Sequence, residues 1–270
     1  MTATAATTHA AADGLRAIEA WMRERSVGWI CAVSPHLDDA SFSIATLLAH
    51  HALPPREVWT VFSASTADGD MAYARATGFA DPLEEFEARR AEDAESMRIL
   101  GVPFRHMGLA ASRFDAAAGQ AVAAEIRARA RALHGEQGAA ALVLLPAGAG
   151  VDPSAFDRLW CRVTRRPVGC RPHGEHEWIR DALVGALSND CLIGWYAEVP
   201  YLWSEGHARL EARLRSSSRQ PLHAFAVAAD VNLKHKAALA YRSQVALVLG
   251  DQPSFQRRSL SGDEWIYLPA

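Results

Sequence analysis

The most constraining feature of the sequence is a change from strand to helix within one short segment. Residues 29–33 (WICAV) form a continuous apolar run that stops at Ser34-Pro35, which is typical of a strand buried on both faces of a sheet. After Asp39 the pattern becomes helical, because side chains recur at three- and four-residue spacing at Ile44, Leu47, Leu48 and His51. The segment SPHLDD is therefore expected to join the end of a buried strand to the start of a helix.

The rest of the chain alternates in a similar way. Strands are expected over Val58–Ser63 and Ala141–Leu145, with a helix from Leu83 to Leu100 between them. This alternation predicts an α/β fold with a Rossmann-like, mainly parallel sheet and helices on both faces. No GxGxxG segment follows the first strand, so a nucleotide-binding Rossmann domain is discounted. The other expected elements are a first helix at 15–25, a helix from near His176, a strand-like segment at 191–203, and helices at 204–214 and 231–249.

Length and composition fit one domain. The chain has 270 residues, half of them hydrophobic, and we expect a disordered tail at 1–13, a domain at 14–270, and a long loop at about 148–172. With a net charge of -3 and no Lys/Arg block, nucleic acid is not an expected partner. No apolar stretch could span a membrane. Four cysteines without a CxxC pair favour a reducing cytoplasmic location. A homo-oligomer is left open.

Candidate metal ligands follow the first strand. Ligands of α/β sheets bind beyond the carboxyl ends of the strands, and His36, Asp38 and Asp39 lie at such an end. Imidazole and carboxylate are ordinary zinc ligands, and a catalytic zinc commonly has three protein ligands and a water. A helix N-terminus favours ionised carboxylates, so one aspartate can bind a metal while the other acts as a base. The alternative reading is an aspartate that caps the helix beside a turn histidine.

A second histidine pair follows a Pro-rich segment. His173 and His176 flank Glu175 just before the predicted helix that carries Ile179 and Leu183. A lone histidine is usually a surface or core residue, but this pair together with the HxDD segment forms a better set of metal ligands. His176 is the expected third ligand.

Four segments in this order resemble a known family. SPHLDDASFS resembles the HPDD-type motif of the PIG-L, or LmbE-like, N-acetylglucosaminyl deacetylases, and RPHGEHEWIRDAL resembles their HxDH motif. RRAEDAESMRILGV is similar to the family's helix with Arg and Glu, and KHKAALAYRSQ to its closing segment. The resemblance covers about residues 29–244.

The resemblance implies a fold, a cofactor and a set of roles. It implies a zinc-dependent N-deacetylase, with another divalent transition metal as an alternative, in which His36, Asp39 and His176 bind the metal. It further implies that Asp38 is the general base, that His173 lies beside the reacting carbonyl and that Arg89 contacts the polar substrate. Arg171 stands where some members have a Tyr, so its guanidinium could stabilise the oxyanion, or it could be a solvated loop arginine.

Several positions depart from the family pattern. Leu37 replaces the usual Pro, Ala40 replaces a frequent Glu, and Glu175 replaces the usual Asp. Ala110 and Ala111 lie where relatives often carry an acidic sugar contact. The substrate of relatives therefore does not transfer to this chain.

Three functions remain for the structure to separate. The leading hypothesis is hydrolysis of an N-acetyl group from a small amino-sugar-like molecule or a glycosylated natural-product intermediate. The second is a zinc amidase that cleaves a larger N-acyl or thiol conjugate. The third is a non-catalytic α/β binding module whose HxDD segment is only a capped turn.

Overall fold

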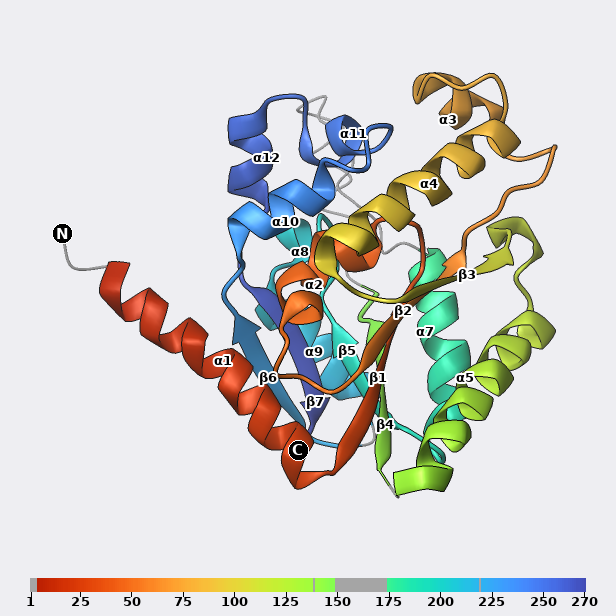
Figure 1. Cartoon of the computed structure of the whole chain (residues 1–270). Helices are drawn as coiled ribbons and strands as arrows, with labels where there is room; N and C mark the ends of the chain where they lie inside the picture. The colour runs from red at the N-terminus through yellow and green to blue at the C-terminus, as the bar shows by residue number, and fades with distance from the viewer. Residues whose placement is uncertain (1–3, 138, 149–173, 219) are drawn as a thin grey trace.

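The computed structural model describes residues 4–137, 139–148, 174–218 and 220–270. These residues form a seven-stranded sheet and the helices that cover it. Strands β1 to β5 pair in parallel, and β7 runs antiparallel to both of its neighbours, β5 and β6. The predicted single α/β domain with a mainly parallel sheet is confirmed (Figure 1). In sheet order the strands are β3 (Phe104–Leu109), β2 (Arg56–Phe62), β1 (Val27–Ser34), β4 (Ala140–Pro146), β5 (Leu192–Tyr196), β7 (Glu264–Pro269) and β6 (Leu222–Val227).

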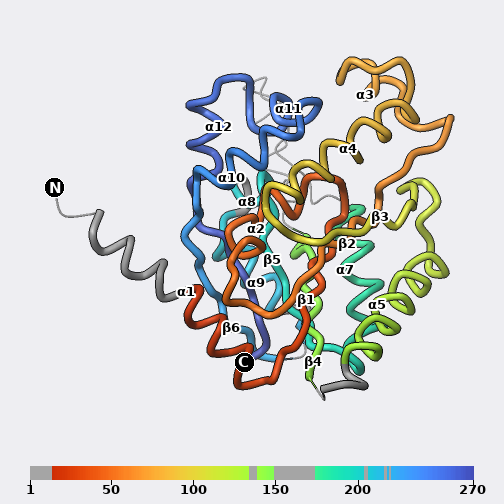
Figure 2. Tube along the Cα trace, viewed as in Figure 1, coloured from red at the N-terminus to blue at the C-terminus, as the bar shows by residue number. Residues whose placement is uncertain are grey.

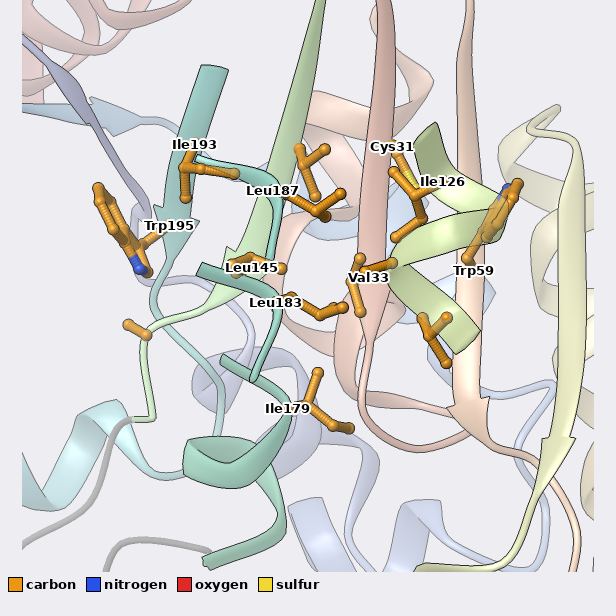
Figure 3. Close-up of a cluster of buried hydrophobic side chains, with 14 of the residues drawn as sticks. Cys31, Val33, Trp59, Ile126, Leu145, Ile179, Leu183, Leu187, Ile193 and Trp195 are labelled. Atoms are coloured by element: carbon orange, nitrogen blue, oxygen red, sulfur yellow. The ribbon is translucent and has the colours of Figure 1, made fainter. Parts of the chain in front are cut away.

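Helices cover both faces of this sheet because the central strands are apolar on both sides. In β1, Trp29, Cys31 and Val33 point to one face and Ile30 and Ala32 to the other. Figure 3 shows the first face, where side chains from β1, β4 and β5 meet those of α5 and α7. The first face is covered by α5 (Ala116–Gln137), α7 (Gly174–Leu187) and α9 (His207–Ser217), and the second by α1 (Thr4–Glu24), α2 (Asp39–Ala49), α4 (Pro82–Leu100) and α10 (Val231–Ala238).

Helix α1 covers the edge of the sheet, and four shorter helices among the described residues complete the fold. From Gly14 onward, α1 lies along β6 (Figure 2). No helix among the described residues is long and apolar enough to span a membrane. The remaining helices are α3 (Met71–Ala76), α8 (Leu202–Glu205), α11 (Val245–Leu249) and α12 (Pro253–Ser259), with a 3₁₀ turn at Ala111–Arg113.

Two predicted helices are wrong as continuous elements. The expected helix at 231–249 is two helices, α10 and α11, because the intervening segment is tied to α4 by Tyr241 and by Ser243, whose backbone N–H donates to Glu92 at 2.9 Å. The expected helix at 204–214 is divided into α8 and α9 at Gly206, where φ is 75°. The antiparallel strands β6 and β7 were not predicted as a pair.

The boundaries at the N-terminus also differ from the prediction. Helix α1 begins at Thr4, within the segment 1–13 that was expected to be a tail, and not at residue 15. From Ile18 to Met22 this helix packs apolar side chains against the sheet. The division of the chain at residue 14 stays a prediction.

The order of the strands determines where a ligand site can form. From β1 the chain crosses to β2 on one side, whereas from β4 it crosses to β5 on the other side. A crevice forms at such a switch, outside the carboxyl ends of the two strands. Residues that follow β1, β4 and β5 therefore converge at one place.

Candidate metal centre

The turn after β1 is held by its own polar groups. The Ser34 hydroxyl donates to the His36 carbonyl at 2.6 Å and accepts from the Ala40 N–H at 3.1 Å. The Asp39 carboxylate accepts from the His36 N–H at 2.8 Å. Asp38 occupies the cap position of α2, but its side chain makes no capping hydrogen bond and instead lines the adjoining cavity. The HxDD segment is therefore more than a capped turn.

A buried ion pair braces the helix that carries this turn. Helix α2 departs from helical geometry at Ile44. Beyond that break, the Glu264 carboxylate accepts from the N–H groups of Thr46 and Leu47, at 2.9 and 3.0 Å. The Lys234 ammonium, 1% exposed, lies 3.1 Å from Glu264. Because backbone groups freed by the break are paired, the short first part of α2 keeps a fixed direction.

Three side-chain atoms converge beside this turn. His36 Nδ1 lies 3.1 Å from Asp39 Oδ2 and 3.2 Å from His176 Nε2, and Asp39 Oδ2 lies 3.3 Å from His176 Nε2. A tetrahedral zinc with bonds of about 2.0–2.1 Å separates its ligand atoms by roughly 3.3–3.4 Å. The triangle therefore has the size and the donor types of a three-residue metal site.

Carboxylates orient both imidazoles. Glu175 Oε2 lies 2.6 Å from His36 Nε2, and Glu198 Oε1 lies 3.1 Å from His176 Nδ1. Glu198 also accepts from the Gly148 N–H at 2.7 Å. When these outer ring nitrogens donate, the inner nitrogens present lone pairs to the common point, which is the usual arrangement of metal-binding histidines. Glu175 of the second predicted motif thus contacts His36 of the first.

Charges around the triangle favour a cation. Burial lowers the pKa of His176, but the carboxylates of Asp39 and Glu198 outweigh this effect and raise that pKa to about 10. Burial raises the pKa of Asp39, yet the nearby imidazoles of His176 and His36 bring it well below its usual range. The centre is therefore stable with added positive charge, which a proton or a divalent cation can supply.

Asp38 lies beside the triangle with an arginine. Burial raises the pKa of Asp38 to about 6, while the Arg89 guanidinium opposes the rise. Arg89 Nη2 lies 3.8 Å from Asp38 Oδ1, and Arg89 Nη1 lies 3.3 Å from Glu85 Oε1. The Asp38 carboxyl therefore holds its proton more tightly than an ordinary aspartate does.

The triangle of His36, Asp39 and His176 opens into a cavity of about 640 Å³. The walls come from the turn after β1, from α3 and α4 on one side, and from α11 and the segment after β5 on the other. Ala110 and Ala111 both line the cavity. Its charged lining residues are His36, Asp38, Asp39, Asp70, Glu85, Arg89 and Glu175, and its larger apolar ones include Phe42, Phe62, Tyr73, Phe86, Val199 and Leu247.

The structure brings most of the predicted site residues together. His36, Asp38, Asp39 and Arg89 line the cavity, and His176, with no exposed surface, lies behind them. The predicted residues His173 and Arg171, and the loop Val151 to Arg171, lie outside the described residues. Sequence reasoning missed Glu198, although its place just after the buried strand β5 was a signal.

Comparisons with known proteins agree with the fold. A family model described as PIG-L: GlcNAc-PI de-N-acetylase matches residues 31–151, which confirms the predicted resemblance. No curated protein matches the chain. Among solved structures, a triple mutant of a deacetylase from the teicoplanin biosynthetic pathway is 22% identical, with a TM-score of 0.63 over 89% of this chain and 97% of that one. The A40926 pseudoaglycone deacetylase is 21% identical, with a TM-score of 0.56 over 91% and 97%.

A further solved structure has the same fold. The zinc-inhibited form of teicoplanin deacetylase is 20% identical, with a TM-score of 0.60 over 89% of this chain and 97% of that one. At these identities the likeness establishes a common fold.

Proposed function

We propose that the chain is a hydrolase of the deacetylase class that removes an N-acetyl group by a metal-dependent mechanism, in agreement with the PIG-L family match over residues 31–151. The observation that carries the proposal is the triangle of His36, Asp39 and His176, which opens into a cavity. Beside it lies the Asp38 carboxylate, which makes no capping hydrogen bond to α2. Both histidines have carboxylate partners, which supports a metal role over a structural one.

The chain's own residues divide the work. His36, Asp39 and His176 would hold the cation, and a divalent cation there supplies an acidified water and polarises the amide carbonyl. Asp38 accepts the proton of the attacking water and returns it to the departing amine. Arg89 lies beside the Asp38 carboxylate and favours its ionised form, and its guanidinium, which lines the cavity, offers a donor to a polar substrate group. We propose that His173 lies beside the reacting carbonyl and that the Arg171 guanidinium stabilises the oxyanion that forms there.

The proposed substrate is an N-acetylated amino-sugar-like molecule or a glycosylated natural-product intermediate. Support comes from the cavity, whose volume of about 640 Å³ accommodates a small glycoside, and from fold neighbours that are deacetylases of teicoplanin and A40926 biosynthesis. We propose Zn²⁺ as the bound ion on the basis of its imidazole and carboxylate donors. The zinc-inhibited form of one neighbour makes other divalent cations a necessary part of the test.

We propose a cytoplasmic location for the protein because of the state of its thiols. Cys31 and Cys191 are free, which suits the reducing cytoplasm.

The test of the proposed function is acetate release from N-acetylated amino sugars and their glycosides by metal-loaded protein. Asp38→Asn should retain stoichiometric metal but lose about 10²–10⁴-fold in turnover, because a carboxamide cannot accept the water proton. Asp251→Asn, which changes an exposed carboxylate outside the cavity, is the matched control and should keep full activity. Unchanged turnover of Asp38→Asn at full metal occupancy would exclude Asp38 as the base.

The same assay separates the alternatives. Release of a larger acyl group but no acetate would favour the amidase. Stoichiometric metal without hydrolysis of any amide would favour a binding module.

A further inference from the structure

The mouth of the cavity carries apolar side chains that are left exposed to solvent. Tyr73 of α3 is 37% exposed and Leu247 of α11 is 55% exposed, and both line the cavity. Phe86 of α4 and Val248 of α11 line it beside them and are half-buried. We refer to these four residues as the apolar rim. Exposed apolar groups that gather at a cavity mouth mark a binding surface.

The rim belongs to one fixed structure. The Tyr73 hydroxyl donates to Gln244 Oε1 at 2.5 Å, and Gln244 immediately precedes α11. Ser243 is held by Glu92 of α4 through both its N–H and its hydroxyl, at 2.9 and 2.6 Å. Helices α3, α4 and α11 therefore stay together over the same end of the sheet (Figure 1). A ligand would meet the rim without having to bring its parts together first.

The charges of the cavity exclude one kind of ligand. Five carboxylates line it, from Asp38, Asp39, Asp70, Glu85 and Glu175, whereas Arg89 is the one Arg or Lys among the described lining residues. The guanidinium of Arg89 already faces the carboxylates of Asp38 and Glu85. Even with a divalent cation bound by His36, Asp39 and His176, the five carboxylates outnumber the two charges of the cation and the one of Arg89, so a phosphate group would meet an excess of like charge.

We propose that the substrate carries an uncharged apolar group attached to its N-acetylated sugar, which packs on the apolar rim, and that phosphate-bearing acetamido sugars are rejected. This inference rests on the proposed function for the position of the acetyl group. The carboxylates would accept hydrogen bonds from sugar hydroxyls, while Tyr73, Phe86, Leu247 and Val248 remove the apolar group from water. The rim, rather than the metal triangle, then selects the substrate.

The test compares three N-acetylglucosamine derivatives that differ at one position: the methyl glycoside, the phenyl glycoside and the 1-phosphate. Calorimetry on metal-loaded Asp38→Asn protein measures binding without turnover, and acetate release by the unmodified protein gives KM. The phenyl glycoside should bind roughly tenfold or more tightly than the methyl glycoside. The 1-phosphate should bind more weakly than the methyl glycoside.

Variants of the rim provide the decisive comparison. Leu247→Asp should bring the ratio of phenyl to methyl affinity close to one, and Tyr73→Ser should reduce it in the same direction. Leu239→Asp is the matched control, because Leu239 is 46% exposed at the end of α10 and is not among the residues that line the cavity. This control should retain the ratio.

Each outcome decides one of the two proposals. If none of the glycosides releases acetate, the proposed function fails, while the binding ratios still test the rim. If the phosphate binds as well as the phenyl glycoside, or if neither rim variant changes the ratio, the inference is overturned. A mass that rises with protein concentration in light scattering, and that Leu247→Asp abolishes, would assign the rim to a second copy of the chain and would also overturn it.

Discussion

Two buried clusters of aspartate and histidine differ in what they can bind. In the first, Asp39 Oδ2 lies 3.1 Å from His36 Nδ1 and 3.3 Å from His176 Nε2. In the second, Asp93 accepts from the Tyr241 hydroxyl at 2.6 Å and lies 2.7 Å from His106 Nε2.

The second cluster is closed, whereas the first is not. Each oxygen of Asp93 has a separate partner, so its contacts are complete as pairs. In the first cluster three acceptor-type atoms face one point, and the outer nitrogens of the two imidazoles are already engaged by Glu175 and Glu198. Residue type therefore does not distinguish a metal site from a structural cluster. Convergence of lone pairs on one point does.

The largest expected effect is the loss of metal binding when His176, a histidine of the first cluster, is replaced. His176→Ala should abolish stoichiometric metal binding and reduce deacetylation by about 10³-fold or more, because the metal contributes several kcal/mol to transition-state stabilisation. His106→Ala is the matched variant and should retain the metal. Elemental analysis and acetate release after dialysis against a zinc buffer provide the readouts. A His176→Ala protein that keeps one tightly bound metal would refute the convergence criterion.

A smaller effect on metal affinity is expected from Glu198, which contacts His176 on the side away from the proposed metal. Glu198→Gln keeps the shape of the side chain but weakens the hold on His176, so metal affinity should fall by about 10–100-fold. Competition with a fluorescent chelator measures this affinity directly. Glu92→Gln changes a carboxylate that holds Ser243 instead and should leave the metal affinity as it is. Equal affinities in the two variants would remove Glu198 from the metal centre.

The smallest expected effect is on how stability depends on pH, and it comes from Asp93 in the second, closed cluster. Burial raises the pKa of Asp93 above its ordinary value of 3.8, although its bonds to His106 and Tyr241 oppose the rise. The folded state therefore holds this proton more tightly than the unfolded state does. Its contribution to stability is fully present below pH 3.8 and declines as the pH rises through the raised pKa of Asp93.

The measurement is a series of denaturant titrations across that range. Between pH 3.8 and the raised pKa, the free energy of unfolding of the unmodified protein should fall relative to that of Asp93→Asn. The variant has no proton to lose at this position and is the reference. A difference that grows with pH in the opposite direction would show that Asp93 is stabilised as a carboxylate.

Local patterns predicted the centre of the fold well. The apolar run at 29–33 and the helical spacing after Asp39 correspond to β1 and α2, and α4 ends at Leu100, as its pattern indicated. These features depend on hydrogen bonds and side-chain spacing within one segment. The break between α10 and α11 depends instead on contacts of Tyr241 and Ser243 with α4, some 150 residues earlier. No Pro or Gly marks that break in residues 239–244.

The sequence alone determined the donors: a histidine and two aspartates at the end of a buried strand, and a second histidine pair before a later helix. The tertiary structure decided how they are used. It places His176, 140 residues away, within 3.2 Å of His36, recruits Glu198 behind it, and leaves Asp38 uncapped beside Arg89. The physical reason is that a donor's chemistry is carried by its own side chain, whereas its geometry and proton affinity depend on neighbours that only the folded sheet brings together.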